Sequence, residues 1–303
     1  MRQTFWLSSY PKSGNTWFRM LIANLRRDAP VDINDLPERG GIASARGWFD
    51  NNMLFASSLL THEECDRLRP RVYAAVAQQQ EQVDTDEAET RIGSARFVKT
   101  HDAWTLTGDG EPLLGGQRGA TGAIVIVRDP RDVAPSLASH NGQSLDEAIA
   151  FMAQSGASFC GSRDRQLNQL RQQLLTWSAY NASWLDQGDL PVHLVRYEDL
   201  HRDTPGVLQR ALAFAGIAVT AAEAAQAARF ADFGELRKQE TERGFREASR
   251  RLSGIGFFRR GVSGAWHDEL SAAQVARIEA DHGAMMERLG YQFSGVRQER
   301  IAG

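Results

Sequence analysis

Cysteine is scarce in this chain of 303 residues, and neither long apolar runs nor an excess of basic charge is present. The two cysteines, Cys65 and Cys160, are isolated from each other, without CxxC spacing, which argues against a disulfide framework or a structural zinc site. This cysteine usage fits a reducing compartment, and we expect a cytoplasmic protein. The formal net charge of -3 gives no global basic field, so we expect no nucleic acid partner.

A membrane span and a secretion signal are also not expected. No window of the sequence approaches the ~20 apolar residues that a transmembrane helix requires. Residues 1–4 run directly into a predicted strand and leave no room for the parts of a signal peptide. The histidines other than His101 are scattered without HxxxH or HxH spacing, so no metal centre is expected.

Short apolar runs alternate with helix-like segments along the chain. The runs at residues 5–8, 97–100, 123–127 and 192–195 are typical of buried parallel strands. Apolar side chains at helical spacing predict helices over residues 15–27 and 163–186. We therefore predict an α/β fold, a doubly wound parallel sheet flanked by helices, with residues 1–303 forming a single domain.

Three stretches match neither pattern. Residues 28–53 are rich in Pro, Gly, Asn and Asp, and residues 105–122 are rich in glycine, so both are predicted to be loops. Residues 78–89 are polar and acidic, and are predicted to be a solvated helix end or a mobile connection.

Residues 9–17, with the sequence SYPKSGNTW, place Lys12, Gly14 and Thr16 on a tight turn between a strand and a helix. Such a turn aims backbone amides and a helix N-terminus at one point, which attracts phosphate or a similar anion. The pattern is not a Walker A motif, because the lysine precedes the glycine. On these residues alone, a helix capped by Ser13 or Asn15 after a proline turn is an equal alternative.

A second candidate motif begins at the end of the strand over residues 123–127. Arg128 follows this strand, and Ser136 lies about two helical turns further on. The guanidinium fork and the serine hydroxyl could together hold a phosphate. The alternative is a surface ion pair between Arg128 and Asp129, with Ser136 as an ordinary helix residue.

Together the two segments resemble the cofactor-binding elements of the sulfotransferase family that uses 3′-phosphoadenosine 5′-phosphosulfate (PAPS). In that family a YPKSGTxW loop holds the 5′-phosphosulfate, and this chain reads YPKSGNTW, departing at Asn15. The family's RxPxDxxxS segment binds the 3′-phosphate, which assigns that role to Arg128 and Ser136. The loop residues assigned to the 5′ side by the resemblance are Lys12, Ser13, Gly14, Asn15, Thr16 and Trp17.

Further segments extend the resemblance from residue 9 to about residue 267. The family's KTH sequence, which carries the catalytic base, is matched at residues 99–101, and its YEDL sequence at residues 197–200. The C-terminal RKGxxGDWK clamp is altered, with Arg260 for Lys, Ala265 for Asp and His267 for Lys. The resemblance implies His101 as general base, Lys99 and Lys12 as assisting cations, and further cofactor contacts from Tyr197, Phe233, Arg259, Arg260 and Gly261.

Ordinary structural roles remain open for several of these side chains. A histidine with a near-neutral pKa suits removal of a proton from an acceptor, but isolated histidines are more often structural. Lys99 could be an ordinary charge at a strand end. The side chains of Trp17 and Phe233 could pack in the core instead of touching adenine, and Tyr197 could cap the sheet edge.

The sequence is thus interpreted as a sulfotransferase with a P-loop-like cradle, moving SO3 from PAPS to a hydroxyl or amine of a small or medium-sized acceptor. The alternatives are a nucleotide kinase-like phosphotransferase using ATP and a non-catalytic nucleotide-binding protein. Residues 28–52 and 141–160 are expected to build the acceptor pocket, whose specificity the sequence leaves open, as it does the oligomeric state, for which a homodimer is one option. Aromatic side chains that hint at an apolar acceptor are Trp48, Phe49, Phe55, Trp104, Phe151 and Phe159.

Overall fold

The computed structural model describes residues 3–36, 41–78, 93, 95–162, 167–248 and 256–294. Within these residues a four-stranded parallel sheet has the order β2-β1-β3-β6. Its strands are β1 (Gln3–Ser9), β2 (Ala95–Thr100), β3 (Gly122–Val127) and β6 (Val192–Arg196). All four predicted strands and their parallel pairing are therefore confirmed.

Side chains along the central strands alternate between two buried layers. In β1, Trp6 packs into one core cluster, whereas Phe5 and Leu7 pack into the other. In β3, Val125 and Ile124 are divided in the same way. Because successive side chains of a strand point to opposite faces, both faces of the sheet need a helical cover, and this confirms the doubly wound α/β fold.

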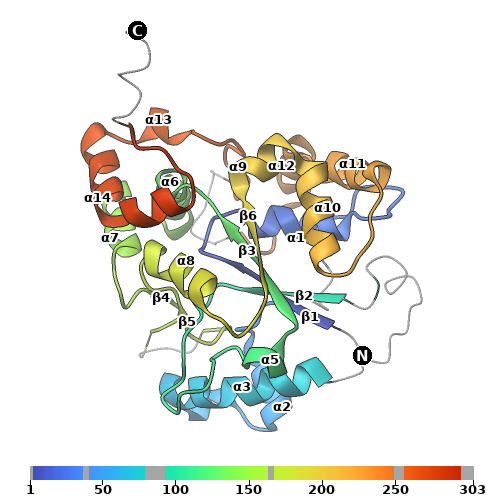
Figure 1. The fold of residues 1–303 in the computed structure, drawn as a ribbon, viewed down its shortest axis with the longest axis vertical. Coiled ribbons are helices and arrows are strands. Elements are labelled where there is room, and N and C mark those ends of the chain that lie inside the picture. Colours follow the sequence, from blue (N-terminus) through green and yellow to red (C-terminus); the bar gives the residue numbers. More distant parts are fainter. Residues whose placement is uncertain are drawn as a thin grey trace.

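Helices cover both faces of the sheet (Figure 1). Among the helices whose side chains join the core cluster that contains Trp6 are α3 (His62–Gln78), α6 (Pro130–Asn141), α7 (Leu145–Met152), α8 (Trp177–Asp186) and α14 (Ala272–Arg288). The opposite cluster is covered by α1 (Asn15–Ala23), α9 (Tyr197–Arg202), α10 (Thr204–Phe214), α11 (Ala221–Phe230) and α12 (Phe233–Arg243). Figure 1 shows α9 to α12 gathered near α1, with α6, α7 and α14 on the other side of β3.

The shorter elements lie at the margins of these layers. They are α2 (Arg46–Met53), η1 (Ser57–Leu59), α5 (Gly116–Gly119), α13 (Trp266–Glu269) and a two-stranded antiparallel sheet of β4 (Ser158–Phe159) and β5 (Gln172–Gln173).

The helix predicted over residues 163–186 is wrong in its first part. The described residues 167–176 hold β5 and irregular backbone, and only Trp177–Asp186 is helical; residues 163–166 lie outside the described residues. Leu175 has a left-handed φ of 59°, which a right-handed helix does not continue through. The hydroxyl of Thr176 then caps α8 by accepting a hydrogen bond from the backbone N–H of Ala179 at 3.0 Å.

Other boundaries also differ from the sequence-based expectations. The helix predicted over residues 15–27 ends at Ala23, and Arg26 has a left-handed φ of 53°. The loop predicted over residues 28–53 contains α2. The sequence of α2 is largely polar, but its buried Phe49 belongs to the core cluster, and Trp48 and Met53 pack against that cluster.

The glycine-rich segment over residues 105–122 is largely irregular, as predicted, but it contains α5 and supplies the first residue of β3. Of the acidic stretch over residues 78–89, Gln78 ends α3, and the remainder lies outside the described residues.

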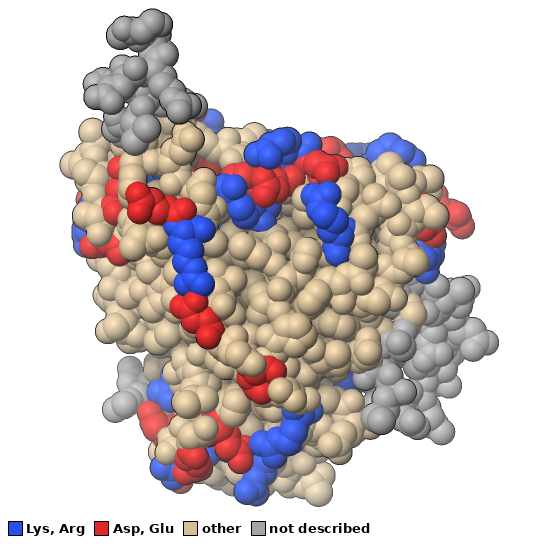
Figure 2. Space-filling model, in the orientation of Figure 1, with Lys and Arg blue, Asp and Glu red and all other residues tan. Residues whose placement is uncertain are grey.

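The face of the molecule seen in Figure 2 carries interspersed Lys, Arg, Asp and Glu rather than a broad patch of one sign. In the described part of the chain, none of the helices combines the length and apolar character that a membrane crossing needs.

Candidate active site

A cavity of about 880 Å³ lies where the carboxyl ends of β1, β2 and β3 meet the segments that follow them. With the exception of Ser13, every residue that the sequence assigned to the site lines this cavity. They are Lys12, Gly14, Asn15, Thr16, Trp17, Lys99, His101, Arg128, Ser136, Tyr197, Phe233, Arg259, Arg260 and Gly261. Ser13 is buried in the loop itself, and its hydroxyl has no hydrogen-bond partner.

The turn after β1 is shaped by Gly14. Its φ is +103°, and a Cβ at this position would lie 2.7 Å from a ring carbon of Tyr197. No side chain caps α1, so the alternative of a helix capped by Ser13 or Asn15 is wrong. Asn15 instead turns its amide back to β1, where Nδ2 donates to the carbonyl of Leu7 at 2.9 Å. The amides of the first helical turn are consequently not satisfied by a side-chain cap, as an anion cradle requires.

Lys12 precedes this turn and has a left-handed backbone, with a φ of 69°. Its Nζ lies 3.7 Å from the centroid of the Phe257 ring, a cation–π contact. Burial, together with the positive charges of Lys99 and Arg128, lowers the pKa of Lys12 to about 7. A buried cation among other cations is stabilised when an anion binds beside it.

Arg128 continues β3 into the same cavity. Its guanidinium lies 4.3 Å from the centroid of the Tyr197 ring and donates from Nη1 to the carbonyl of Lys12 at 3.3 Å. Its Nε is buried without a partner. The alternative of a surface ion pair with Asp129 is wrong, because Asp129 is buried, caps α6 and pairs with Arg131 at 2.7 Å.

Two aromatic side chains border the part of the cavity between α1 and α12. Trp17 donates from Nε1 to the carbonyl of Ala231 at 3.0 Å, and its ring meets Tyr197 edge-on at 5.6 Å. Phe233 presses against Gly261, where an added Cβ would lie 2.1 Å from the ring. Both rings also pack against the core, so packing and cavity lining are combined rather than exclusive.

The segment with the altered clamp residues lies over the N-terminal part of α6. The buried carboxylate of Asp132 accepts hydrogen bonds from the backbone N–H groups of Gly264 at 2.7 Å and Trp266 at 3.0 Å. Arg259 and Arg260 both pair with Glu269 of α13. The cationic side chains of the segment thus border the cavity while carrying partners of their own.

His101 lies at the end of β2 with its tautomer defined by its contacts. Nδ1 is 2.7 Å from the carbonyl oxygen of Ser9, so Nδ1–H donates and Nε2 is left as the basic nitrogen. Burial lowers the pKa of His101 to about 3, with Lys99 contributing to the shift. The imidazole is therefore neutral at neutral pH, in the form that can accept a proton.

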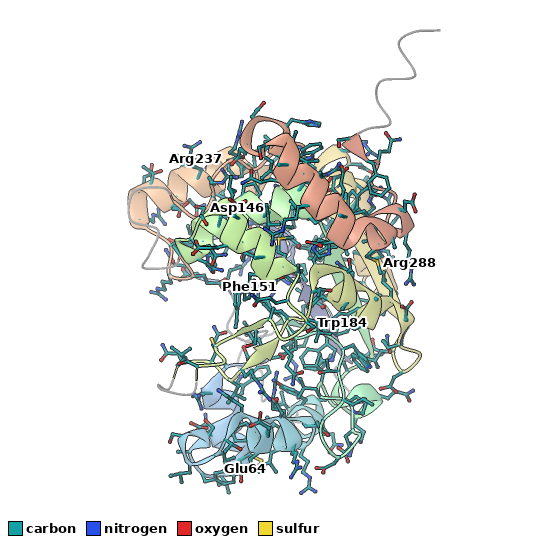
Figure 3. The ribbon with its side chains drawn as sticks, turned by 90° about the vertical axis from the view of Figure 1, so that its left-hand side faces the viewer. Glu64, Asp146, Phe151, Trp184, Arg237 and Arg288 are labelled. Carbon is teal, nitrogen blue, oxygen red and sulfur yellow. The ribbon has the colours of Figure 1, made fainter. Side chains whose placement is uncertain are left out.

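Several further side chains line the cavity that the sequence did not assign, among them Arg19, His140, Glu247 and Phe257. His140 could have been found, because it lies one helical turn beyond Ser136 on α6. Glu247 is 148 residues from Lys99, its ion-pair partner, and no spacing rule connects them. Of the aromatics suggested for an acceptor pocket, Phe159 lines the cavity. Phe151, labelled on α7 in Figure 3, stacks behind it at 6.0 Å.

The expected acceptor segments also reach the cavity. Residues 33, 34, 36, 41 and 42 contribute from the first, and residues 141, 159 and 160 from the second. Across the described residues there is no cluster of three or more His, Cys, Asp or Glu side chains arranged for a metal ion.

A family model described as "Sulfotransferase domain" matches residues 2–290. The structure of mouse sulfotransferase SULT7A1 complexed with PAP is similar, with a TM-score of 0.55 and 20% identity over 98% of this chain and 86% of that chain. Retinol dehydratase in complex with androsterone and the inactive cofactor PAP is also similar, with a TM-score of 0.55 and 17% identity over 96% of this chain and 83% of that chain. No curated protein matches the chain. At these identities the structural likeness shows a shared fold.

Proposed function

We propose that the cavity of this chain, which belongs to the sulfotransferase domain family and is accordingly a PAPS-dependent sulfotransferase, transfers SO3 from PAPS to a hydroxyl or amine of a small or medium-sized acceptor. His101 is the proposed general base. The family match disfavours the ATP-dependent kinase alternative. We also propose that residues 1–303 act as one cytoplasmic domain that binds no nucleic acid, with a homodimer as one possible assembly.

One observation carries the assignment of residues: the two predicted phosphate-binding segments meet. Arg128 donates to the carbonyl of Lys12, so the loop after β1 and the end of β3 are direct neighbours. The uncapped start of α1 and Lys12 suit the 5′-phosphosulfate, while Arg128 and Ser136 suit the 3′-phosphate.

The chemistry follows from these positions. The acceptor oxygen or nitrogen forms a bond to sulfur as the bond between sulfur and the phosphate oxygen breaks, and adenosine 3′,5′-bisphosphate (PAP) leaves. The proton of the acceptor passes to Nε2 of His101, and the cationic Lys12 and Lys99 offset the negative charge of the donor group.

Ligand binding tests the assignment of the cofactor site. We expect PAP to raise the melting temperature more than ATP–Mg, and to bind more tightly than AMP, which lacks the 3′-phosphate. Arg128→Gln should weaken PAP binding by about 10- to 100-fold, the effect of losing a charge-assisted hydrogen bond, and leave AMP binding nearly unchanged. Arg118→Gln, on the exposed side of α5, is the control. If Arg128→Gln weakened the binding of PAP and of AMP equally, a contact between Arg128 and the 3′-phosphate would be excluded.

Turnover tests the general base. With labelled PAPS and a panel of phenols, sugars, steroid-like alcohols and amines, His101→Ala should lower kcat by about 10²- to 10⁴-fold while PAP binding is kept. His193→Ala is the matched control, since His193 stacks on Phe214 away from the cavity. A His101→Ala variant with wild-type turnover would exclude His101 as base. Absence of transfer from PAPS to any acceptor by the wild type would instead favour a non-catalytic nucleotide-binding role.

A further inference from the structure

A carboxylate from outside all the recognised motifs lies inside the cavity. Glu247 accepts from Arg19 at 2.7 Å through Oε1 and from Lys99 at 3.3 Å through Oε2. The side chains of Arg19 and Lys99 are 15% and 14% exposed, and that of Glu247 is 32% exposed. The three residues come from α1, from β2 and from the segment after α12, so the bridge ties three elements together at the cavity wall.

The segment that carries Glu247 is anchored on both sides. The side chain of Asn34 donates to the carbonyl of Gly244 at 3.0 Å and accepts from the backbone N–H of Arg246 at 2.8 Å. The ring of Phe245 packs against Phe257 at 4.9 Å. These contacts present the carboxylate to the cavity from a defined backbone position.

Positive and titratable groups face Lys99 from every other side. Arg19 comes from α1 and Lys12 from the loop after β1, while His101 directly follows β2 and His140 lies in the last turn of α6. Burial lowers the pKa of Lys99, and the charge of Glu247 acts in the opposite direction. The carboxylate itself has a pKa of about 2 although burial would raise it, because Lys99 and Arg19 stabilise its charged form. Without Glu247, burial and the neighbouring cations would favour the neutral amine.

We propose that Glu247 is a positioning residue that, braced by Arg19, holds the side chain of Lys99 in the cavity as an ammonium ready to meet the sulfonate of the donor. This inference rests on the proposed function for the identity of the donor. It accounts for a half-buried carboxylate in a cavity otherwise suited to anions, because the carboxylate maintains a cation before the anionic substrate arrives.

Direct titration of the lysine tests the inference without turnover. The chain has three lysines, Lys12, Lys99 and Lys238, so protein labelled with [ε-¹³C]lysine should give three resolvable NMR signals, and Lys99→Arg identifies the one from Lys99. In Glu247→Gln the titration midpoint of Lys99 should fall by about one to three pH units. Glu247→Asp should restore part of the shift. The control is Glu242→Gln, an exposed carboxylate near the end of α12, which should leave the midpoint in place. An unchanged midpoint in Glu247→Gln overturns the inference.

Kinetics supply a second, independent readout. Because kcat/KM for PAPS reports on the unliganded enzyme, its alkaline limb should move to lower pH in Glu247→Gln, and kcat should shift less. In a Lys99→Arg background the shift should vanish, because a guanidinium does not titrate in this range. A shift that persists there would assign it to Lys12 and overturn the inference.

Failure of the proposed function and failure of this inference give different experimental results. If the wild type neither binds PAP nor uses PAPS, the proposed function fails, whatever the midpoint of Lys99. If PAP still stabilises Glu247→Gln and activity falls equally at every pH with the Lys99 midpoint unmoved, Glu247 is merely structural.

Discussion

Substitution of Gly14 by alanine tests whether the turn after β1 has the geometry described above. The residue combines a φ of +103° with a Cβ position 2.7 Å and 3.1 Å from two ring carbons of Tyr197. The ring has little room to move away, because Tyr197 is 6% exposed and its ring contacts both the guanidinium of Arg128 and the indole of Trp17.

Two costs add in the Gly14→Ala variant. A left-handed backbone costs an L-residue about 1–2 kcal/mol, and overpacking a filled site costs typically about 1–3 kcal/mol. The free energy of unfolding should therefore fall by about 2–5 kcal/mol. Urea unfolding followed by tryptophan fluorescence, with the m-value checked for constancy, measures this change without any ligand.

Gly110→Ala separates the two costs. Gly110 has a φ of +80° with nothing within 4 Å of the added Cβ, so only the backbone cost of about 1–2 kcal/mol applies. In addition, Tyr197→Ala should relieve the steric part of Gly14→Ala, so that the double variant is less destabilised than the sum of the two single ones. The steric explanation would be refuted if Gly14→Ala and Gly110→Ala lost the same unfolding free energy. It would also be refuted if the loss in the double variant equalled the sum of the losses in Gly14→Ala and Tyr197→Ala within about 0.5 kcal/mol.

Two further predictions concern buried charge. Arg69, which is fully buried, donates to Asp102 and to the hydroxyl of Tyr73, so Arg69→Met should cost about 3–5 kcal/mol of unfolding free energy by leaving the carboxylate unpaired. The exposed pair of Arg118 and Glu111 is the control, and Arg118→Met should cost about 1 kcal/mol or less; similar losses for both arginines would contradict the reasoning. For Lys12, the native pKa of about 7 lies below the unfolded value of about 10.4, so the unfolded state binds more protons between these values and stability rises with pH across that window. In Lys12→Met this rise in stability with pH should be absent. If the urea midpoints of Lys12→Met instead changed with pH in parallel with those of the wild type, a depressed pKa of Lys12 would be excluded.

The sequence predicted those parts of the protein whose signals are local. The strands are contiguous apolar runs, and each formed where it was predicted, because burial on both faces of a parallel sheet requires such runs. The residues of the turn after β1 and of the segment from Arg128 to Ser136 follow strand ends. The carboxyl ends of parallel strands meet at one edge of the sheet, so side chains recognised as motifs came to line one cavity.

Local signals were insufficient where two structures compete for the same residues. Residues 167–176 have apolar side chains at helical spacing, yet the left-handed Leu175 and the pairing of β5 with β4 displace the helix. Ser13 and Asn15 are residue types that often cap helices, and only the structure shows that neither caps α1. Tertiary contacts decided each case, because they contribute more than the small differences in local propensity.

By itself, then, the chain determined its sheet and the identity of the cations and hydroxyls that follow the strands, because hydrophobic period and motif spacing are properties of neighbouring residues. Only the tertiary structure decided that Arg19, Lys99 and Glu247 share one bridge, that His101 turns Nδ1 to Ser9, and that Tyr197 fills the space beside Gly14. These residues are distant in sequence. Their contacts depend on where the folded sheet and its connections carry them, and no spacing rule encodes that.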